Sequence, residues 1–226
     1  MKKLAYLLLG TLFIYSCSNA TSEKQADAEQ EPEVEATEVA TPSSDLTVLN
    51  PNLASVNDLY TLGLLDPEIQ EITGGRPYLD PMDFLTKLKE VVGDGKFEEM
   101  KAKMFLPMNL NITEEENFKM VPKVGDKMAH EFEEYRPYTS VEQFRREIGK
   151  YVSEEEVAAY ENYVFVPVNL NTASKEEILS IPGVGEKMLH EFEEYRPYQS
   201  IEQFRREIGK YVDEVELARL ERYVTL

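Results

Sequence analysis

The sequence predicts an all-α protein of three tandem modules of about 60 residues, which follow a disordered acidic linker. The first observation is a repeat: two blocks that start at His130 and His190, residues 130–152 and 190–212, are identical at 21 of 23 positions. A decayed earlier copy is visible, because the Arg-Pro-Tyr triplet at Arg76 precedes the one at Arg136 by the same interval. Apolar residues also recur at helical spacing, and no stretch alternates convincingly with period two. The predicted modules are residues 48–107, 108–167 and 168–226.

Residues 1–16 have the pattern of a signal peptide. Two lysines precede an apolar run, Leu4 to Tyr15, which is too short to span a bilayer. Cys17, the only cysteine, follows almost directly, so the pattern resembles a bacterial lipoprotein signal in which this cysteine is lipidated. The resemblance implies an exported protein that its lipid anchors to the membrane of the bacterial cell envelope, on the periplasmic or the surface face of the outer membrane. The alternative is an ordinary secretory signal with an incidental cysteine.

The composition of residues 17–47 predicts a disordered acidic linker. These residues are mainly acidic side chains, Ala, Ser, Thr and Pro, with too few large apolar side chains to form a core. Residues 1–47 together hold three lysines and eight acidic residues, a net charge of −5. We expect a self-repelling spacer. The alternative is an acidic segment that recruits a basic partner.

The overall composition excludes several classes of protein. Lys and Arg number 24 against 43 Asp and Glu, for a net charge of −19, which excludes a polycationic nucleic-acid coat protein. One cysteine excludes an intramolecular disulfide and a Cys-rich zinc site. A hydrophobic fraction of 42% is sufficient for a folded core.

The third module shows the predicted helices most clearly. Ser174 and Glu177 have the spacing of a capping box at the start of a first helix, which ends before Pro182. The second helix ends at the Arg196-Pro197 pair. Apolar stripes mark the second helix (Met188, Leu189, Phe192, Tyr195), the third (Ile201, Phe204, Ile208, Tyr211) and the fourth (Leu217, Leu220, Val224). We expect these stripes to form the core, and neighbouring modules to share apolar faces, because one module is marginal by itself.

The turn between the first two of these helices, Pro182-Gly183-Val184-Gly185, has the chemistry of an anion site. Gly183 and Gly185 can adopt positive φ and permit close approach of a ligand. The free N–H groups and the positive dipole end of the second helix favour an anion. Contacts of this kind position a protein on DNA but carry no base information.

Residues 169–192, NLNTASKEEILSIPGVGEKMLHEF, resemble the helix-hairpin-helix modules of ComEA-like DNA-uptake proteins, which open with a similar NLNTA and place a GxG turn between two short helices. The resemblance covers each copy of the repeat in outline. It implies three helix-hairpin-helix modules that bind double-stranded DNA without reading its sequence. The phosphate-binding positions that it implies are Gly183, Val184, Gly185 and Lys187 in the third module, and Lys123, Gly125 and Lys127 in the second.

The copies depart from the family pattern at several positions. Lys123 replaces the first glycine of the second module, and Asp126 and Glu186 put carboxylates in the first helical turn, where they would compete with phosphate. Residues 62–65 of the first module lack the second glycine and any nearby lysine, so we expect that hairpin to be structural. The family's second hairpin would lie at residues 208–215, which lack GxG.

The charge of the modules argues against strong DNA binding. The three modules carry net charges of −4, −6 and −4 in chain order, and affinity for duplex DNA comes largely from released counterions. Arg205, Arg206 and Lys210, which have identical counterparts in the second module, can form a narrow positive stripe beside the hairpin. The alternative, which we favour, is that they pair with Glu202 and Glu207 on a solvated helix face.

We expect neither catalysis nor a metal site. The GVGEK string also resembles the hairpin of DNA glycosylases whose catalytic lysine follows the turn, which would nominate Lys187. That chemistry needs an aspartate on a following element, but residues 187–212 hold none, and Asp213 is explained more simply as a helix cap. His190 and Glu194 have the spacing of two metal ligands on one helix, with no third ligand apparent.

The sequence is compatible with two functions. The first is an envelope-anchored receptor that binds double-stranded DNA through the hairpins, as in DNA uptake, with no cofactor and no small-molecule substrate. The second is a non-catalytic scaffold that has kept the fold, lost DNA binding, and binds an envelope protein partner. The near-identity of residues 130–152 and 190–212 fits either a recent duplication or a repeated binding surface.

Overall fold

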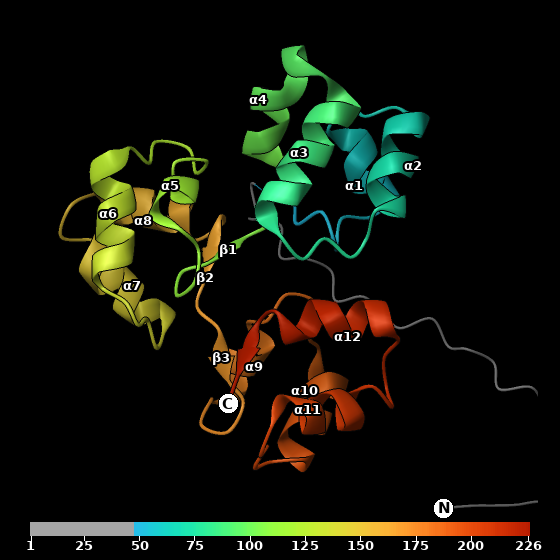
Figure 1. Cartoon of the computed structure of the whole chain (residues 1–226), viewed down its shortest axis with the longest axis vertical. Helices are drawn as coiled ribbons and strands as arrows, with labels where there is room; N and C mark the ends of the chain where they lie inside the picture. The colour runs from blue at the N-terminus through green and yellow to red at the C-terminus, as the bar shows by residue number, and fades with distance from the viewer. Residues whose placement is uncertain (1–47) are drawn as a thin grey trace, which may run out of the picture. The chain divides into compact units, whose positions relative to one another are not determined.

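The computed structural model describes residues 48–226, shown in Figure 1. The predicted signal peptide (1–16) and the predicted lipidated Cys17 and linker (17–47) lie outside the described residues. Within residues 48–226 the protein is mostly helical, with twelve helices and four very short strands. We call residues 48–107, 108–167 and 168–226 segments 1, 2 and 3. No helix of this described part is long and apolar enough to cross a membrane.

Each segment contains four helices, and segments 2 and 3 each add two strands (Figure 1). Segment 1 contains α1 (Val56–Thr61), α2 (Asp66–Gly74), α3 (Pro81–Val92) and α4 (Asp94–Lys103). Segment 2 contains β1 (Met108–Asn109), α5 (Glu115–Phe118), α6 (Asp126–Glu134), α7 (Val141–Ile148), α8 (Glu154–Tyr160) and β2 (Val164–Phe165). Segment 3 contains β3 (Val168–Asn169), α9 (Lys175–Leu179), α10 (Glu186–Glu194), α11 (Ile201–Ile208), α12 (Glu214–Glu221) and β4 (Val224–Thr225).

The helices of segment 3 begin where the sequence predicts. Ser174 and Glu177 form the capping box of α9, with both reciprocal hydrogen bonds present. Ser200 caps α11, and the Asp213 carboxylate accepts from the backbone N–H of Glu216 at 2.8 Å, so Asp213 is a helix cap as expected. Helix α10 ends just before the Arg196-Pro197 pair. Side-chain caps therefore fix the start of three of these four helices.

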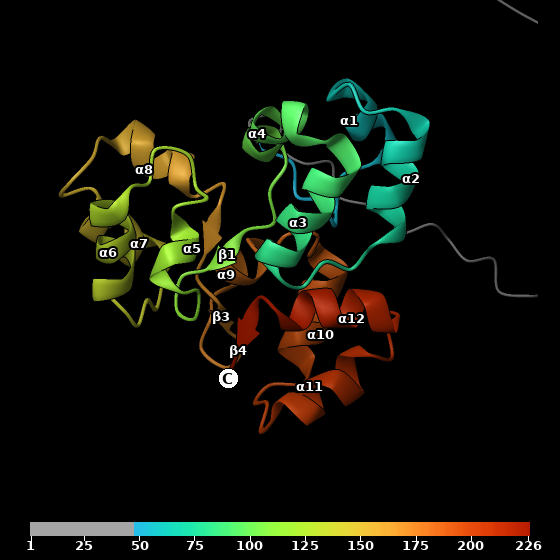
Figure 2. The same cartoon turned by 45° about the horizontal axis from the view of Figure 1, so that its top comes forward.

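The strands correct the all-α prediction. Strand β1 pairs with β2, and β3 with β4, in parallel two-stranded ladders that join the start of a segment to its end (Figure 2). Segment 1 has only an isolated bridge between Leu49 and Met104. The prediction missed these strands because two residues are too short to show an alternating pattern. Val224, predicted to belong to the fourth helix, lies in β4.

A second closure in each segment joins an asparagine to a tyrosine backbone. In segment 3 the Asn171 amide donates to the Tyr198 carbonyl at 2.9 Å and accepts from the Tyr198 N–H at 2.7 Å. The same two bonds join Asn52 to Tyr78 and Asn111 to Tyr138. Both polar groups of the loop before the third helix are thereby satisfied, so the loop can pack against the first helix of its segment.

Most residues of the apolar stripes form the core, as expected, but Tyr211 follows α11 and is 47% exposed. One cluster of buried side chains runs through segments 1 and 2, where the rings of Phe105 and Tyr163 meet edge-on at 5.0 Å. A second cluster lies within segment 3 and includes Leu189 and Phe192 of α10. The second helix of every hairpin buries its apolar face in one of these two clusters, which therefore support the hairpins.

Candidate nucleic-acid interface

In all three segments the turn between the first two helices contains a residue with positive φ, although in segment 1 the chain from the start of the first helix to that residue is one residue shorter. Gly63, Lys123 and Gly183 occupy equivalent positions and all have positive φ, at 81°, 66° and 81°. A lysine in this left-handed region is uncommon and shows that the turn itself demands the conformation. The second glycine differs from expectation: Gly185 has φ −107° and Gly125 has φ −104°, which any residue can adopt. These two glycines instead leave open space beside the turn, because a Cβ at either position would meet no atom within 4 Å.

Helices α6 and α10 begin without a side-chain cap. Their N-cap residues are Gly125 and Gly185. Helices α2, α4 and α5 also lack a side-chain cap, whereas the other seven begin with a Ser or Asp side chain that accepts from the first turn. Within residues 48–226, the N–H groups of Gly185, Glu186 and Lys187 donate to no protein acceptor, and those of their segment 2 counterparts donate to none either. Each helix of nine residues therefore presents free amides beside the positive end of its dipole.

Segment 1 shows what the first of these amides can bind. The N–H of Leu65, equivalent to Gly185, donates to a carboxylate oxygen of Glu68 at 2.7 Å. The N–H of Gly63 donates to the Tyr60 carbonyl at 2.9 Å. Segment 1 thus fills its own anion position with an internal carboxylate. In segments 2 and 3 a methionine, Met128 or Met188, replaces Glu68 and leaves the position open.

The first-turn carboxylates do not occupy these amides. Neither Asp126 nor Glu186 accepts a hydrogen bond from a first-turn N–H. The predicted competition with phosphate for these amides is therefore not seen in the structure. Asp126 instead lies 2.6 Å from the Lys119 ammonium group. The hydrogen bond from Lys119 lowers the pKa of Asp126 below its usual value. Lys119 therefore neutralises the acidic residue beside the segment 2 turn.

The hairpin lysines are the exposed cations without an acidic partner. Lys123, Lys127 and Lys187 are exposed, and none forms an ion pair within residues 48–226. Every other Lys or Arg of this range either forms an ion pair or, like Arg76, Arg196 and Arg222, donates to a backbone carbonyl. The cations free to contact a phosphate thus lie at the two open hairpins.

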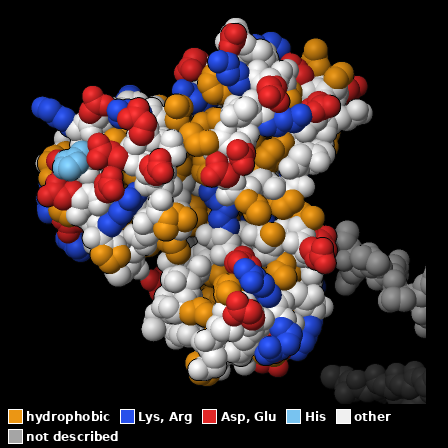
Figure 3. Space-filling model, viewed as in Figure 1, with side chains coloured by type: hydrophobic (Ala, Val, Ile, Leu, Met, Phe, Trp, Pro, Cys, Tyr) orange, Lys and Arg blue, Asp and Glu red, His pale blue; other side chains and the backbone are white. Residues whose placement is uncertain are grey.

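The basic cluster on α11 and just after it is neutralised, as the favoured interpretation predicted. Arg205 donates to Glu221 from two nitrogens, with one bond at 2.6 Å, and Arg206 and Lys210 both pair with Glu207. The sequence missed Glu221, which comes from α12. Figure 3 shows acidic and basic side chains interspersed over the visible face. No positive stripe extends from the hairpin along α11.

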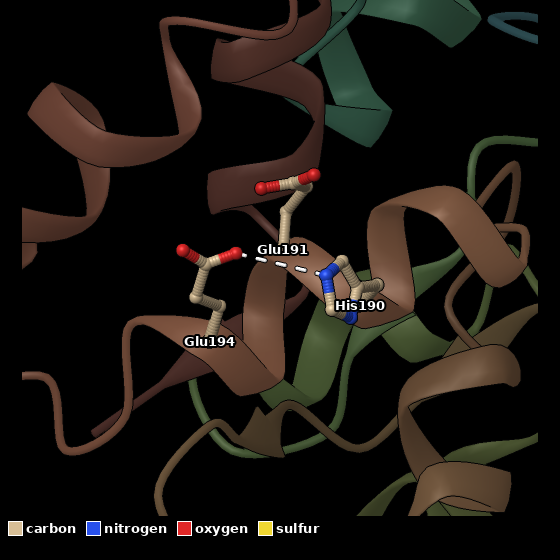
Figure 4. Close-up of side chains that lie close together, drawn as sticks. All are labelled: His190, Glu191 and Glu194. Carbon is tan, nitrogen blue, oxygen red and sulfur yellow. Dashed lines mark ion pairs between the residues drawn. The ribbon is translucent and has the colours of Figure 1, made fainter.

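A group of possible metal ligands lies on α10, one turn beyond the hairpin (Figure 4). Ligand atoms of His190, Glu191 and Glu194 lie within 4.8 Å of one another, and His190 pairs with Glu194 at 3.7 Å. Glu191 is the third candidate ligand, which the sequence pattern did not indicate. Its counterpart in segment 2 is arranged differently, because His130 Nδ1 lies 3.3 Å from Glu115, whose hydrogen bond raises the pKa of His130. The group is partly exposed and acidic, which is common without a metal.

Sequence reasoning also missed two residues at the turns. Glu68 had a recognisable signal, because a glutamate three residues after an N-cap position is the second half of a capping box. Arg219 had none. It lies on α12, 37 residues from the turn, yet its guanidinium is buried and donates to the Pro182 carbonyl. Its counterpart in segment 2 is Ala159.

Comparison with protein families gives one match: the helix-hairpin-helix motif, over residues 167–192. This range contains β3, α9, the Pro182–Gly185 turn and most of α10. Comparison with curated proteins and with solved structures gives no match. The family match is compatible with nucleic-acid binding and, apart from residue 167, lies in segment 3.

Proposed function

We propose that the protein binds double-stranded DNA without sequence preference, through the open hairpins of segments 2 and 3. The single observation that carries this proposal is the internal carboxylate of segment 1, which bonds the turn amide of Leu65 at 2.7 Å. The same amide at Gly125 and Gly185 is free, and an unpaired lysine follows each. A backbone phosphate oxygen has the charge and hydrogen-bonding capacity of that carboxylate.

The proposed contacts are to phosphates only. The turn offers backbone N–H groups and lysine ammonium groups, which neutralise phosphate but do not distinguish bases. We also propose that segments 1, 2 and 3 are copies of one helix-hairpin-helix module, since the positive-φ position and the uncapped second helix recur in segment 2. Segment 1 acts as a structural copy. We assign no catalytic step to Lys187, because no aspartate lies on α10 or α11.

The negative charge of the segments limits the expected affinity. Two hairpins with three lysines provide few phosphate contacts, and the surrounding acidic residues repel DNA. We therefore expect binding that is measurable at low salt and weak at physiological salt. Attachment of many copies to one surface would raise the effective affinity for a long duplex.

Replacing Gly125 and Gly185 together by leucine is expected to remove binding and leave the fold intact. Leucine occupies the equivalent position, Leu65, of segment 1, and the φ values of both glycines suit any residue. The new side chains would stand in the open space beside the free amides. The measurement is fluorescence anisotropy of a random-sequence duplex with the purified full chain in mild detergent, over a salt series.

Wild-type binding should weaken with salt at a slope of about −0.9 per phosphate contact. A matched control replaces Gly95, which lies on α4 away from both hairpins and whose Cβ would also meet nothing within 4 Å, by alanine. Binding that survives the double leucine change would contradict the proposal. A folded wild-type chain that fails to bind DNA even at low salt would favour the protein-interaction scaffold, which the neutralised α11 cluster also fits.

We further propose that the protein is exported and held at the bacterial cell envelope by a lipid on Cys17. The support is the position of the only cysteine, separated by one residue from the apolar run. Cys17→Ser is expected to move the protein from the membrane fraction to the soluble fraction, because the proposed anchor is lost. Ser18→Ala is the matched control. A Cys17→Ser protein that stays in the membrane fraction would contradict lipidation at this residue.

A further inference from the structure

The turn of segment 3 is supported from behind by a buried arginine. The Arg219 side chain is 3% exposed and donates to the carbonyl oxygen of Pro182. Two of its nitrogens also bond the Glu216 carboxylate, at 2.6 and 2.7 Å. All three interactions are made inside the protein, so the guanidinium is not available to touch a phosphate itself.

The bond to Pro182 fixes the orientation of the next amide. In a trans peptide unit the C=O and the following N–H point in opposite directions. Arg219 holds the Pro182 carbonyl inward, which directs the N–H of Gly183 away from the protein. That N–H donates to no acceptor within residues 48–226, and the N–H of Lys123 in segment 2 donates to none either. Its counterpart at Gly63, which comes one residue sooner after the start of the first helix, is bonded to Tyr60.

Arg219 gives a second reason for glycine at position 183, beside its positive φ. A Cβ on Gly183 would lie 2.7 Å from a guanidinium nitrogen of Arg219 and 3.2 Å from Leu53 Cδ2. The first distance is too short for any real contact. The observed position of the Arg219 guanidinium is therefore compatible only with a glycine at position 183.

In segment 2 the two equivalent positions hold a larger residue at the turn and a smaller one on the fourth helix. Lys123 carries a Cβ at the turn position, and Ala159 replaces the arginine. The space that the guanidinium fills in segment 3 is a cavity of about 110 Å³ in segment 2, lined by Pro122, Lys123, Glu156 and Ala159 among others. In segments 2 and 3 a cation therefore lies at this place, Lys123 on the turn or Arg219 behind it.

We propose that Arg219 is a positioning residue for the segment 3 anion site, and that it directs the Gly183 amide toward the bound phosphate. This inference rests on the proposed function. It names a residue outside the matched hairpin motif, which ends at residue 192. The support from α12 makes the open turn of segment 3 depend on a helix that the hairpin itself does not contain.

A thermal-unfolding cycle tests the geometry without DNA. Gly183→Ala is expected to lower the unfolding midpoint of the full chain by roughly 4 °C more with Arg219 present than in an Arg219→Ala background. The positive φ and the Leu53 contact destabilise Gly183→Ala equally in both backgrounds. The difference between the two midpoint shifts therefore measures the overlap of the new Cβ with the guanidinium. Equal shifts in both backgrounds would overturn the inference.

Amide NMR of the full chain in detergent, titrated with a random-sequence duplex, tests the positioning. The Gly183 N–H signal should respond to the duplex in the wild type, lose that response in Arg219→Ala, and regain it in Arg219→Lys. Arg206→Ala, which removes an exposed arginine, should leave the response unchanged. An unaltered Gly183 response in Arg219→Ala would overturn the inference. A coupled unfolding cycle with no response in the wild type would overturn the proposed function and leave the Arg219 support of the turn in place.

Discussion

Replacing Lys123, Lys127 and Lys187 together by glutamine is expected to lower the affinity for duplex DNA by on the order of 100-fold at low salt. These are the exposed cations of residues 48–226 that lack an acidic partner, so their loss removes the available phosphate contacts. The salt dependence should flatten by about 0.9 in slope for each lysine that contacts a phosphate. Anisotropy over a salt series measures both quantities.

A second triple variant controls for net charge. Lys89, Lys103 and Lys175 are ion-paired with Asp94, Glu99 and Glu193 and lie outside the turns. Their replacement by glutamine removes the same three charges and is expected to change affinity only slightly. Equal losses in the two triple variants would show that bulk charge, and not the hairpins, governs binding. Circular dichroism should show the same helicity in both.

Phe132→Ala is expected to reduce the stability of the protein by about 3–5 kcal/mol. Phe132 lies on α6, is fully buried, and meets the rings of Phe118, Phe144 and Tyr160 edge-on at 5.2 to 5.5 Å. The deletion would leave a cavity under the segment 2 hairpin and remove three aromatic contacts at once. Denaturant unfolding followed by circular dichroism measures the loss.

Ile112→Ala is the matched control, because Ile112 is 76% exposed and should change stability by less than about 0.5 kcal/mol. A Phe132→Ala protein within about 1 kcal/mol of the wild type would mean that α6 is not held by this core. The hairpin of segment 2 would then lack the support that the DNA-binding proposal requires.

The sequence was sufficient for the helices and their starts. Ser174 with Glu177 and Asp213 with Glu216 cap helices by bonds between residues three apart, which a linear pattern contains. The strands could not be predicted from the sequence, because β3 and β4 are two residues long and their pairing joins the two opposite ends of segment 3. Such a ladder is decided by closure of the whole segment and leaves no local pattern.

The candidate site was predicted in part. The positive φ of Gly183 followed from its residue type and its place in the turn. The extended backbone of Gly185 did not, because glycine permits both conformations and only the observed turn selects one. Arg219 could not be found, since its contact with Pro182 depends on how α12 packs against the turn. The near-identical block of residues 190–212 stops before it.

Amide NMR of the full chain with a random-sequence DNA duplex tests the central claim most directly, because it reports each backbone N–H separately. The account predicts that the largest changes fall on the free amides of Gly125, Asp126 and Lys127, and on those of Gly185, Glu186 and Lys187. The Leu65 amide, already bonded to Glu68, should not respond. Changes confined to other surfaces, or none at low salt, would contradict binding of DNA by the hairpins.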